Sequence, residues 1–127
     1  MSAQALRLLL IEDSEDDATL LLHELKRCGY ATAHTRVETR EELDQALNQG
    51  PWDVIITDYG LPRFDGLAAF AMVRQRGLDV PFLIVSGTIG EDVAVEAMKA
   101  GVHDYVLKGR LGRLGPAGGR GAGRQMH

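Results

Sequence analysis

The sequence has no long apolar run and only one cysteine in its 127 residues. No stretch approaches the roughly 20 apolar residues that a membrane-spanning helix needs, and no secretion-signal pattern opens the chain. The single Cys28 excludes a disulfide within the chain and is typical of a reducing compartment. These absences predict a cytoplasmic domain without a membrane segment, in which Cys28 is a buried apolar thiol.

Basic residues are scarce before residue 109. Residues 1–108 carry all 18 acidic residues and ten of the 14 basic ones, whereas residues 109–127 carry four arginines and no acid. An acidic body repels the phosphate backbone of nucleic acids, so we do not expect the domain itself to bind them. The length and the apolar content of 45% predict one domain with a single core.

Short apolar runs alternate with helical patterns along the chain. Residues 54–56 form a continuous apolar run, which predicts a strand that is buried on both faces. Ser14 and Thr39 are candidate N-caps of helices, and Gly29 supplies the residue that follows a helix. We expect strands at 6–11, 30–37, 54–56, 81–85 and 104–107, and helices at 15–28, 40–49, 66–77 and 91–100. This order predicts a parallel sheet with helices on both faces.

Four of the predicted strands end in residues suited to metal or phosphate chemistry. Glu12 and Asp13 follow the first strand and Asp58 the third. Ser86 follows the fourth strand and Lys108 the fifth. In a parallel sheet these ends share one edge, where ligands bind. Three converging carboxylates repel one another unless a cation joins them, and a donor set of oxygens alone favours Mg²⁺ over Zn²⁺. The hydroxyl group of Ser86 and the ammonium group of Lys108 can then contact a phosphoryl group.

Each of these residues, taken singly, also has a plain structural interpretation. Asp58 can form an Asx-turn, and Glu12 or Asp13 can cap a helix. Ser86 can belong to a turn, and Lys108 can be a solvated surface charge. The coincidence of all five at strand ends favours a common site.

From residue 6 to about residue 111, the sequence resembles the receiver domain of response regulators in two-component signalling. The motifs that carry the resemblance are Ile11-Glu12-Asp13-Ser14, Thr57-Asp58-Tyr59-Gly60-Leu61-Pro62 with Asp65-Gly66, Val85-Ser86-Gly87 and Asp104-Tyr105-Val106-Leu107-Lys108. The resemblance implies an α/β, flavodoxin-like (CheY-like) three-layer sandwich. Its five-stranded parallel sheet would have the strand order 2-1-3-4-5.

The resemblance also implies the roles of the acidic residues. Asp58 is then the phospho-accepting nucleophile. The Mg²⁺ ligands are then Glu12, Asp13, Asp58 and the backbone carbonyl of Gly60. Glu12 departs from the family pattern, in which the first acid is often Asp. Gly60 stands where other receivers carry side chains that tune the lifetime of the phosphoryl group.

For the remaining site residues, the resemblance implies contacts and a switch. Ser86 and Lys108 would contact the phosphoryl group, and Ser86 and Tyr105 would change conformation together. Without the resemblance, Tyr105 is best interpreted as a half-buried strand aromatic.

The C-terminal end departs most from the family. Leu111 and Leu114 begin the pattern of a fifth helix, but Gly115-Pro116 interrupts it. Seven of the last 19 residues are glycine, and each costs about 1 kcal/mol in a helix relative to alanine. We therefore expect a receiver domain at 1–111 with the fifth helix truncated or absent. Residues 112–127 would be a Gly/Arg-rich tail that is a linker to another domain, an interaction segment or an artefact of cloning or reading frame. A linker or an artefact is ranked above an RNA contact. A sheet face left uncovered in this way predicts a possible homodimer.

The expected function is to accept a phosphoryl group from a histidine kinase or phosphotransfer protein and to relay the signal by a conformational change. The chain would catalyse only its own phosphorylation and dephosphorylation. One alternative is a metal-dependent phosphohydrolase that works through an aspartyl phosphate, although such an enzyme usually needs a second acid where Gly60 stands. Another is an interaction module that works without phosphorylation.

Overall fold

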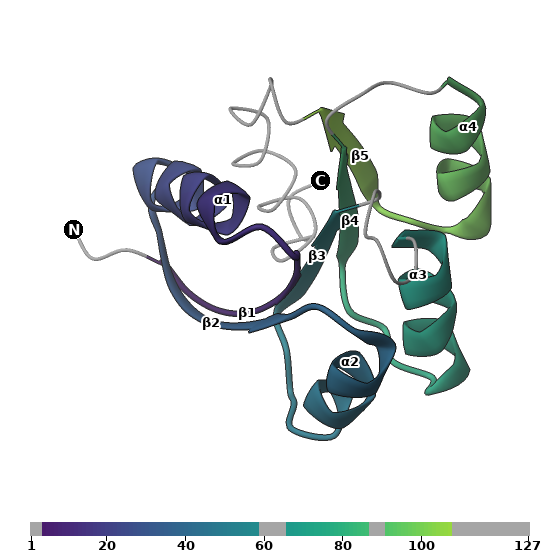
Figure 1. Cartoon of the computed structure of the whole chain (residues 1–127), viewed down its shortest axis with the longest axis horizontal. Helices are drawn as coiled ribbons and strands as arrows, with labels where there is room; N and C mark the ends of the chain where they lie inside the picture. Colours follow the sequence, from purple (N-terminus) through teal and green to yellow (C-terminus); the bar gives the residue numbers. More distant parts are fainter. Residues whose placement is uncertain (1–3, 59–65, 87–90, 108–127) are drawn as a thin grey trace.

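The computed structural model describes residues 4–58, 66–86 and 91–107 of the chain. Within these ranges five strands alternate with four helices (Figure 1). The elements are β1 (Gln4–Ile11), α1 (Glu15–Arg27), β2 (Tyr30–Val37), α2 (Arg40–Leu47), β3 (Val54–Asp58), α3 (Gly66–Gln75), β4 (Phe82–Ser86), α4 (Glu91–Ala100) and β5 (Asp104–Leu107).

All five strands are parallel and lie in the order β2-β1-β3-β4-β5. Among the described helices, α1 packs on one face of the sheet and α2, α3 and α4 pack on the other (Figure 1). The predicted three-layer, flavodoxin-like architecture and its strand order are therefore confirmed. The expectation about a fifth helix falls on residues 108–127, outside the described residues.

The core has two parts, one on each side of the sheet. Every residue of β3 and of β4 is buried, and for β3 the continuous apolar run at 54–56 predicts this burial. On the α1 side, Leu21 and Leu25 pack with sheet residues such as Leu10. On the other side, the rings of Phe70 and Phe82 meet edge to face with their centroids 5.0 Å apart. This burial keeps β1, β3 and β4 rigid beneath the ends that carry the acidic residues.

The predicted helix caps are present. The Ser14 hydroxyl accepts a hydrogen bond from the backbone N–H of Asp17, and the Thr39 hydroxyl accepts one from that of Glu42. Gly29 has a φ of +99°, the left-handed conformation that ends α1. The prediction for Cys28 is only partly right, because this residue lies at the C-cap of α1 and is half-buried.

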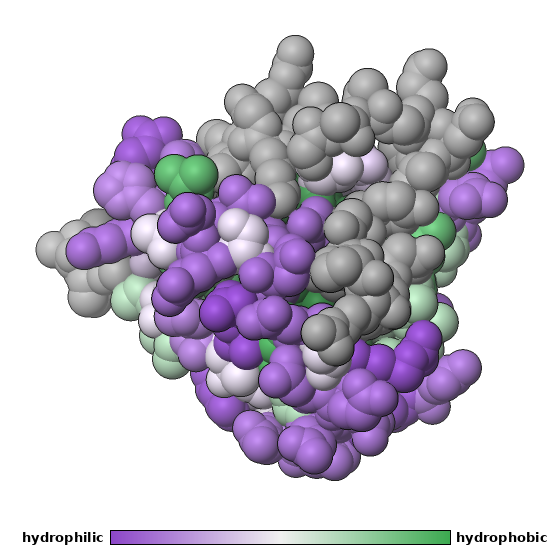
Figure 2. All heavy atoms as spheres, viewed as in Figure 1, coloured by the Kyte–Doolittle hydropathy of each residue, from purple (hydrophilic) through white to green (hydrophobic). Residues whose placement is uncertain are grey.

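The surface agrees with the absence of long apolar runs. The described residues in the view of Figure 2 are mainly hydrophilic, with small and separate hydrophobic areas. Across the described residues, no helix combines the length and the apolar character needed to cross a membrane.

Candidate metal and phosphoryl site

Three carboxylates meet at the C-terminal edge of the sheet. Glu12 and Asp13 follow β1, and Asp58 ends β3. Because β1 and β3 are neighbours with Ile11 paired to Thr57, the residues that come next also lie side by side. One ligand oxygen from each of the three carboxylates lies within 4.8 Å of the others. The structure therefore brings together the three acids that the sequence places at strand ends.

The cluster is partly sealed from solvent. Glu12 is 3% exposed and Asp58 9%, whereas Asp13 is exposed. Buried carboxylates that lie this close repel one another in their ionised form. A cation with oxygen ligands relieves this repulsion, and no His or Cys belongs to the cluster among the described residues. The donor set therefore fits a hard divalent cation that is held partly by the protein and partly by water.

The main chain of Glu12 is fixed from β2. Its N–H donates to the carbonyl of Val37 at 3.0 Å, and its carbonyl accepts a hydrogen bond from Nη1 of Arg36 at 3.0 Å. The side chain is fixed locally, because Oε1 accepts a hydrogen bond from the backbone N–H of Ser14 at 3.1 Å. Arg36 is a residue that the sequence reasoning misses. The signal was its position next to the end of β2, which reaches the same edge of the sheet.

Ser86 lies on the strand next to Asp58. In the register of β3 and β4, Asp58 is paired with Val85, so Ser86 is one residue further along. Ser86 is buried at 6% exposure. Ser86 therefore lies at the same edge of the sheet as the acid cluster, and its contact with a phosphoryl group stays a prediction.

Tyr105 lies on β5, opposite Ile84 of β4. It is half-buried and packs against the core on the side of α2, α3 and α4. The interpretation of Tyr105 as a half-buried aromatic residue on a strand is correct for its position. Its predicted role with Ser86 stays a prediction. Lys108 and Gly60, the other two predicted site residues, lie outside the described residues.

Comparisons with known proteins agree with this geometry. The family model "Response regulator receiver domain" matches residues 8–113. CheY1, a chemotaxis protein of Helicobacter pylori, is 31% identical over 108 residues, which cover 81% of this chain and 85% of CheY1. PhoP of Bacillus subtilis, a transcriptional regulatory protein of alkaline phosphatase synthesis, is 32% identical over 102 residues, or 80% of this chain and 42% of PhoP. The chain thus spans less than half the length of some of the relatives that it matches.

A solved structure shows the same fold. The Mn²⁺-bound form of the response regulator Rcp1 superposes with a TM-score of 0.75 and 21% identity, covering 96% of each chain. The sheet order, the acid cluster at its C-terminal edge and the match over residues 8–113 lead to one conclusion. This chain belongs to the receiver domains of response regulators.

Proposed function

We propose that the chain is a phosphoacceptor that takes one phosphoryl group onto Asp58 in a Mg²⁺-dependent reaction. The observation that carries the proposal is the cluster of Glu12, Asp13 and Asp58, whose ligand oxygens lie within 4.8 Å of one another. One carboxylate in it ends a buried central strand, and the other two directly follow the neighbouring strand. This arrangement leaves a nucleophile next to a cation site.

The transfer needs no general base. A carboxylate oxygen of Asp58 attacks phosphorus, the bond from phosphorus to a histidine nitrogen of the donor breaks, and the imidazole leaves with the electron pair. The product is an acyl phosphate. Glu12, Asp13, Asp58 and the backbone carbonyl of Gly60 would hold Mg²⁺, which would offset negative charge on the phosphoryl oxygens. Lys108 supplies a second positive charge to the same oxygens.

Ser86 and Tyr105 convert the modification into a signal. The Ser86 hydroxyl donates to a phosphoryl oxygen and so gains a partner that exists only in the phosphorylated state. Tyr105 lies on β5 beside β4, at a half-buried position where a change of rotamer alters the surface. The switch therefore runs from β3 through β4 to β5.

The donor is a histidine kinase or a phosphotransfer protein, and the setting is the cytoplasm. Self-association through the α1 side of the sheet is a further prediction from the Gly/Arg-rich tail. Light scattering at micromolar concentration tests it, and a strictly monomeric chain would contradict it.

Incubation with acetyl phosphate and Mg²⁺ tests the proposal, with the intact mass as the readout. We expect the parent to gain one acid-stable, base-labile phosphoryl group, and a chelator to prevent this. Asp58→Asn should not be labelled. Asp79→Asn is the matched control, because Asp79 is an exposed acid that lies before β4, and it should be labelled like the parent.

Other results would point to other functions. Label that persists in Asp58→Asn would identify a different acceptor. Continuous release of phosphate from a generic phosphate ester would favour a phosphohydrolase. No label from any small phosphodonor would favour an interaction module.

A further inference from the structure

We propose that Arg36 is a positioning residue that sets the metal affinity of the acid cluster by holding the peptide group between Glu12 and Asp13. This inference rests on the proposed function. Arg36 lies on β2, next to the last residue of the strand, and its side chain is 27% exposed. It touches none of the three carboxylates in any bond that the structure describes, and it acts through the main chain.

The contact is specific. Nη1 of Arg36 donates to the carbonyl oxygen of Glu12 at 3.0 Å. That carbonyl belongs to the peptide group that joins Glu12 to Asp13, so its direction decides where both side chains leave the backbone. The N–H of Glu12 is held by Val37, also on β2. The end of β2 therefore fixes the backbone on both sides of the Glu12 α-carbon.

Glu38 offsets the charge that Arg36 brings to the site. Its Oε2 lies 3.1 Å from the same Nη1. An unpaired guanidinium group here would repel a divalent cation in the neighbouring cluster. The ion pair leaves the hydrogen bond to the carbonyl in place and sets a compensating negative charge beside the same guanidinium group.

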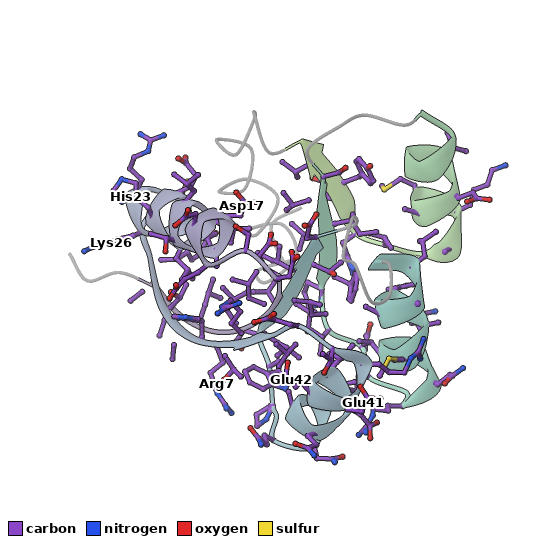
Figure 3. The ribbon with its side chains drawn as sticks, in the orientation of Figure 1. Arg7, Asp17, His23, Lys26, Glu41 and Glu42 are labelled. Carbon is purple, nitrogen blue, oxygen red and sulfur yellow. The ribbon has the colours of Figure 1, made fainter. Side chains whose placement is uncertain are left out.

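Glu38 is itself tied to α2. Its backbone N–H donates to Oε1 of Glu42 at 2.7 Å, and Glu42 lies in the first turn of α2 (Figure 3). Hydrogen bonds and the ion pair thus run from α2 through Glu38 and Arg36 to Glu12. An exposed ion pair alone contributes little to stability. A hydrogen bond to the main chain of a buried metal ligand can instead act on metal affinity. Groups that orient metal ligands from outside the ligand shell change metal affinity by about 10–100-fold.

Calorimetric titration of the parent and its variants with Mn²⁺ and Mg²⁺ tests the inference. Arg36→Ala should weaken metal binding about 10-fold, in keeping with the loss of a group that orients a ligand. Arg36→Lys keeps a positively charged donor on a side chain one bond shorter, and it should recover part of the affinity. Arg27→Ala is the matched control, because Arg27 forms an exposed ion pair with Glu24 on α1. It should bind metal like the parent.

Measuring metal affinity at low and at high salt separates the positioning effect of Arg36 from the effect of its charge. The Debye length falls from about 10 Å at 0.1 M salt to about 3 Å at 1 M. The loss in Arg36→Ala should persist at high salt, since it concerns geometry. Glu38→Gln leaves the guanidinium charge without its ion-pair partner, so its weaker binding should appear at low salt and fade at high salt.

A metal-free measurement keeps this inference separate from the proposed function. Amide resonances and hydrogen exchange of residues 12–14 should change in Arg36→Ala without any metal, and Arg27→Ala should leave them unchanged. Arg36→Ala with parental metal affinity and parental spectra at residues 12–14 would overturn the inference. If the parent itself bound no metal, the proposed function would fail, and the metal-free spectra would still decide the role of Arg36.

Discussion

The guanidinium carbon of Arg7 lies 4.7 Å from the centroid of the Trp52 ring, at the end of the sheet away from the acid cluster. Trp52 is 7% exposed and its indole N–H donates to the carbonyl of Ala46 at 3.1 Å. Asp58 lies six positions after Trp52, and the four steps from Val54 to Asp58 along β3 alone span about 13 Å at the usual rise of about 3.3 Å per strand residue. Figure 3 likewise shows Arg7 well apart from Asp17 at the start of α1.

This relationship predicts that the single tryptophan does not report on the site. Titration with Mg²⁺ should leave the Trp52 emission unchanged while amide resonances near Asp58 shift. Arg7→Ala should shift the emission and lower the free energy of unfolding by about 0.5–1 kcal/mol, the usual contribution of an exposed cation–π contact. Its metal affinity, measured by calorimetry, should equal that of the parent. A loss of affinity in Arg7→Ala would mean that the two ends of the sheet are coupled.

A second prediction concerns Asp13, the exposed member of the cluster. Without metal, Asp13→Asn should be at least as stable as the parent, because one repelling charge is gone. At saturating Mg²⁺ the order should reverse, since only the parent gains the stabilisation of about 2.7 kcal/mol that a ligand at 100 times its dissociation constant provides. Urea unfolding of the parent and of Asp13→Asn, once with Mg²⁺ and once with a chelator, measures the stability difference in each condition. Equal stabilisation of the two proteins by Mg²⁺ would remove Asp13 from the ligand set.

A third prediction compares two neighbouring leucines on α1. Leu21 is 4% exposed and belongs to the core, whereas Leu20 is 59% exposed. Leu21→Ala should lower the free energy of unfolding by about 2–5 kcal/mol, because it leaves a cavity against the sheet. Leu20→Ala is the control and should change it by about 0.5 kcal/mol or less. A large loss in Leu20→Ala would show that this side chain is covered in solution, for example by a second copy of the chain.

A fourth prediction concerns high pH. Burial raises the pKa of the Tyr30 phenol above its ordinary value, with a smaller contribution from the charge of Cys28. The folded state therefore holds the proton at pH values where the unfolded state has lost it. The resulting stability is complete below the ordinary pKa of about 10 and is lost as the pH rises through the folded-state pKa.

Tyr30→Phe removes this contribution. Its free energy of unfolding should fall less steeply than that of the parent between pH 9 and the onset of alkaline unfolding, as measured by urea titration at several pH values. Both proteins carry the same lysines and arginines, so the difference isolates the phenol. Parallel pH profiles would contradict the assignment.

Local signals in the sequence were sufficient for most of the fold. Ser14 and Thr39 cap helices through bonds to residues three positions away, so their roles could be predicted from short patterns. The buried strand at 54–56 could be predicted from its continuous run of apolar residues alone. The predicted third helix was two residues too long, because Gly77 has a φ of +72° and the helix ends at Gln75.

The site could be predicted only in part. The proximity of Glu12, Asp13 and Asp58 could be predicted, because the carboxyl ends of parallel strands meet at one edge of the sheet. Arg36 was missed because its bond to Glu12 joins a side chain to a main-chain group 24 positions away, and no local pattern records such a contact. The burial of Cys28 was overestimated, because this residue lies at the C-cap of α1 and is only half-buried.

All three carboxylates of the cluster come from the first 58 residues, and Arg36 comes from the same segment. Ser86 and Tyr105 come from the strands that follow. The three carboxylates proposed to hold the cation therefore precede in the sequence the two residues proposed to respond to the phosphoryl group. On the ribosome, β1, β2 and β3 emerge before β4, so the three carboxylates are synthesised before Ser86 and Tyr105. A cut between β3 and β4 would separate the acid cluster from Ser86 and Tyr105 and would also break the pairing of β3 with β4.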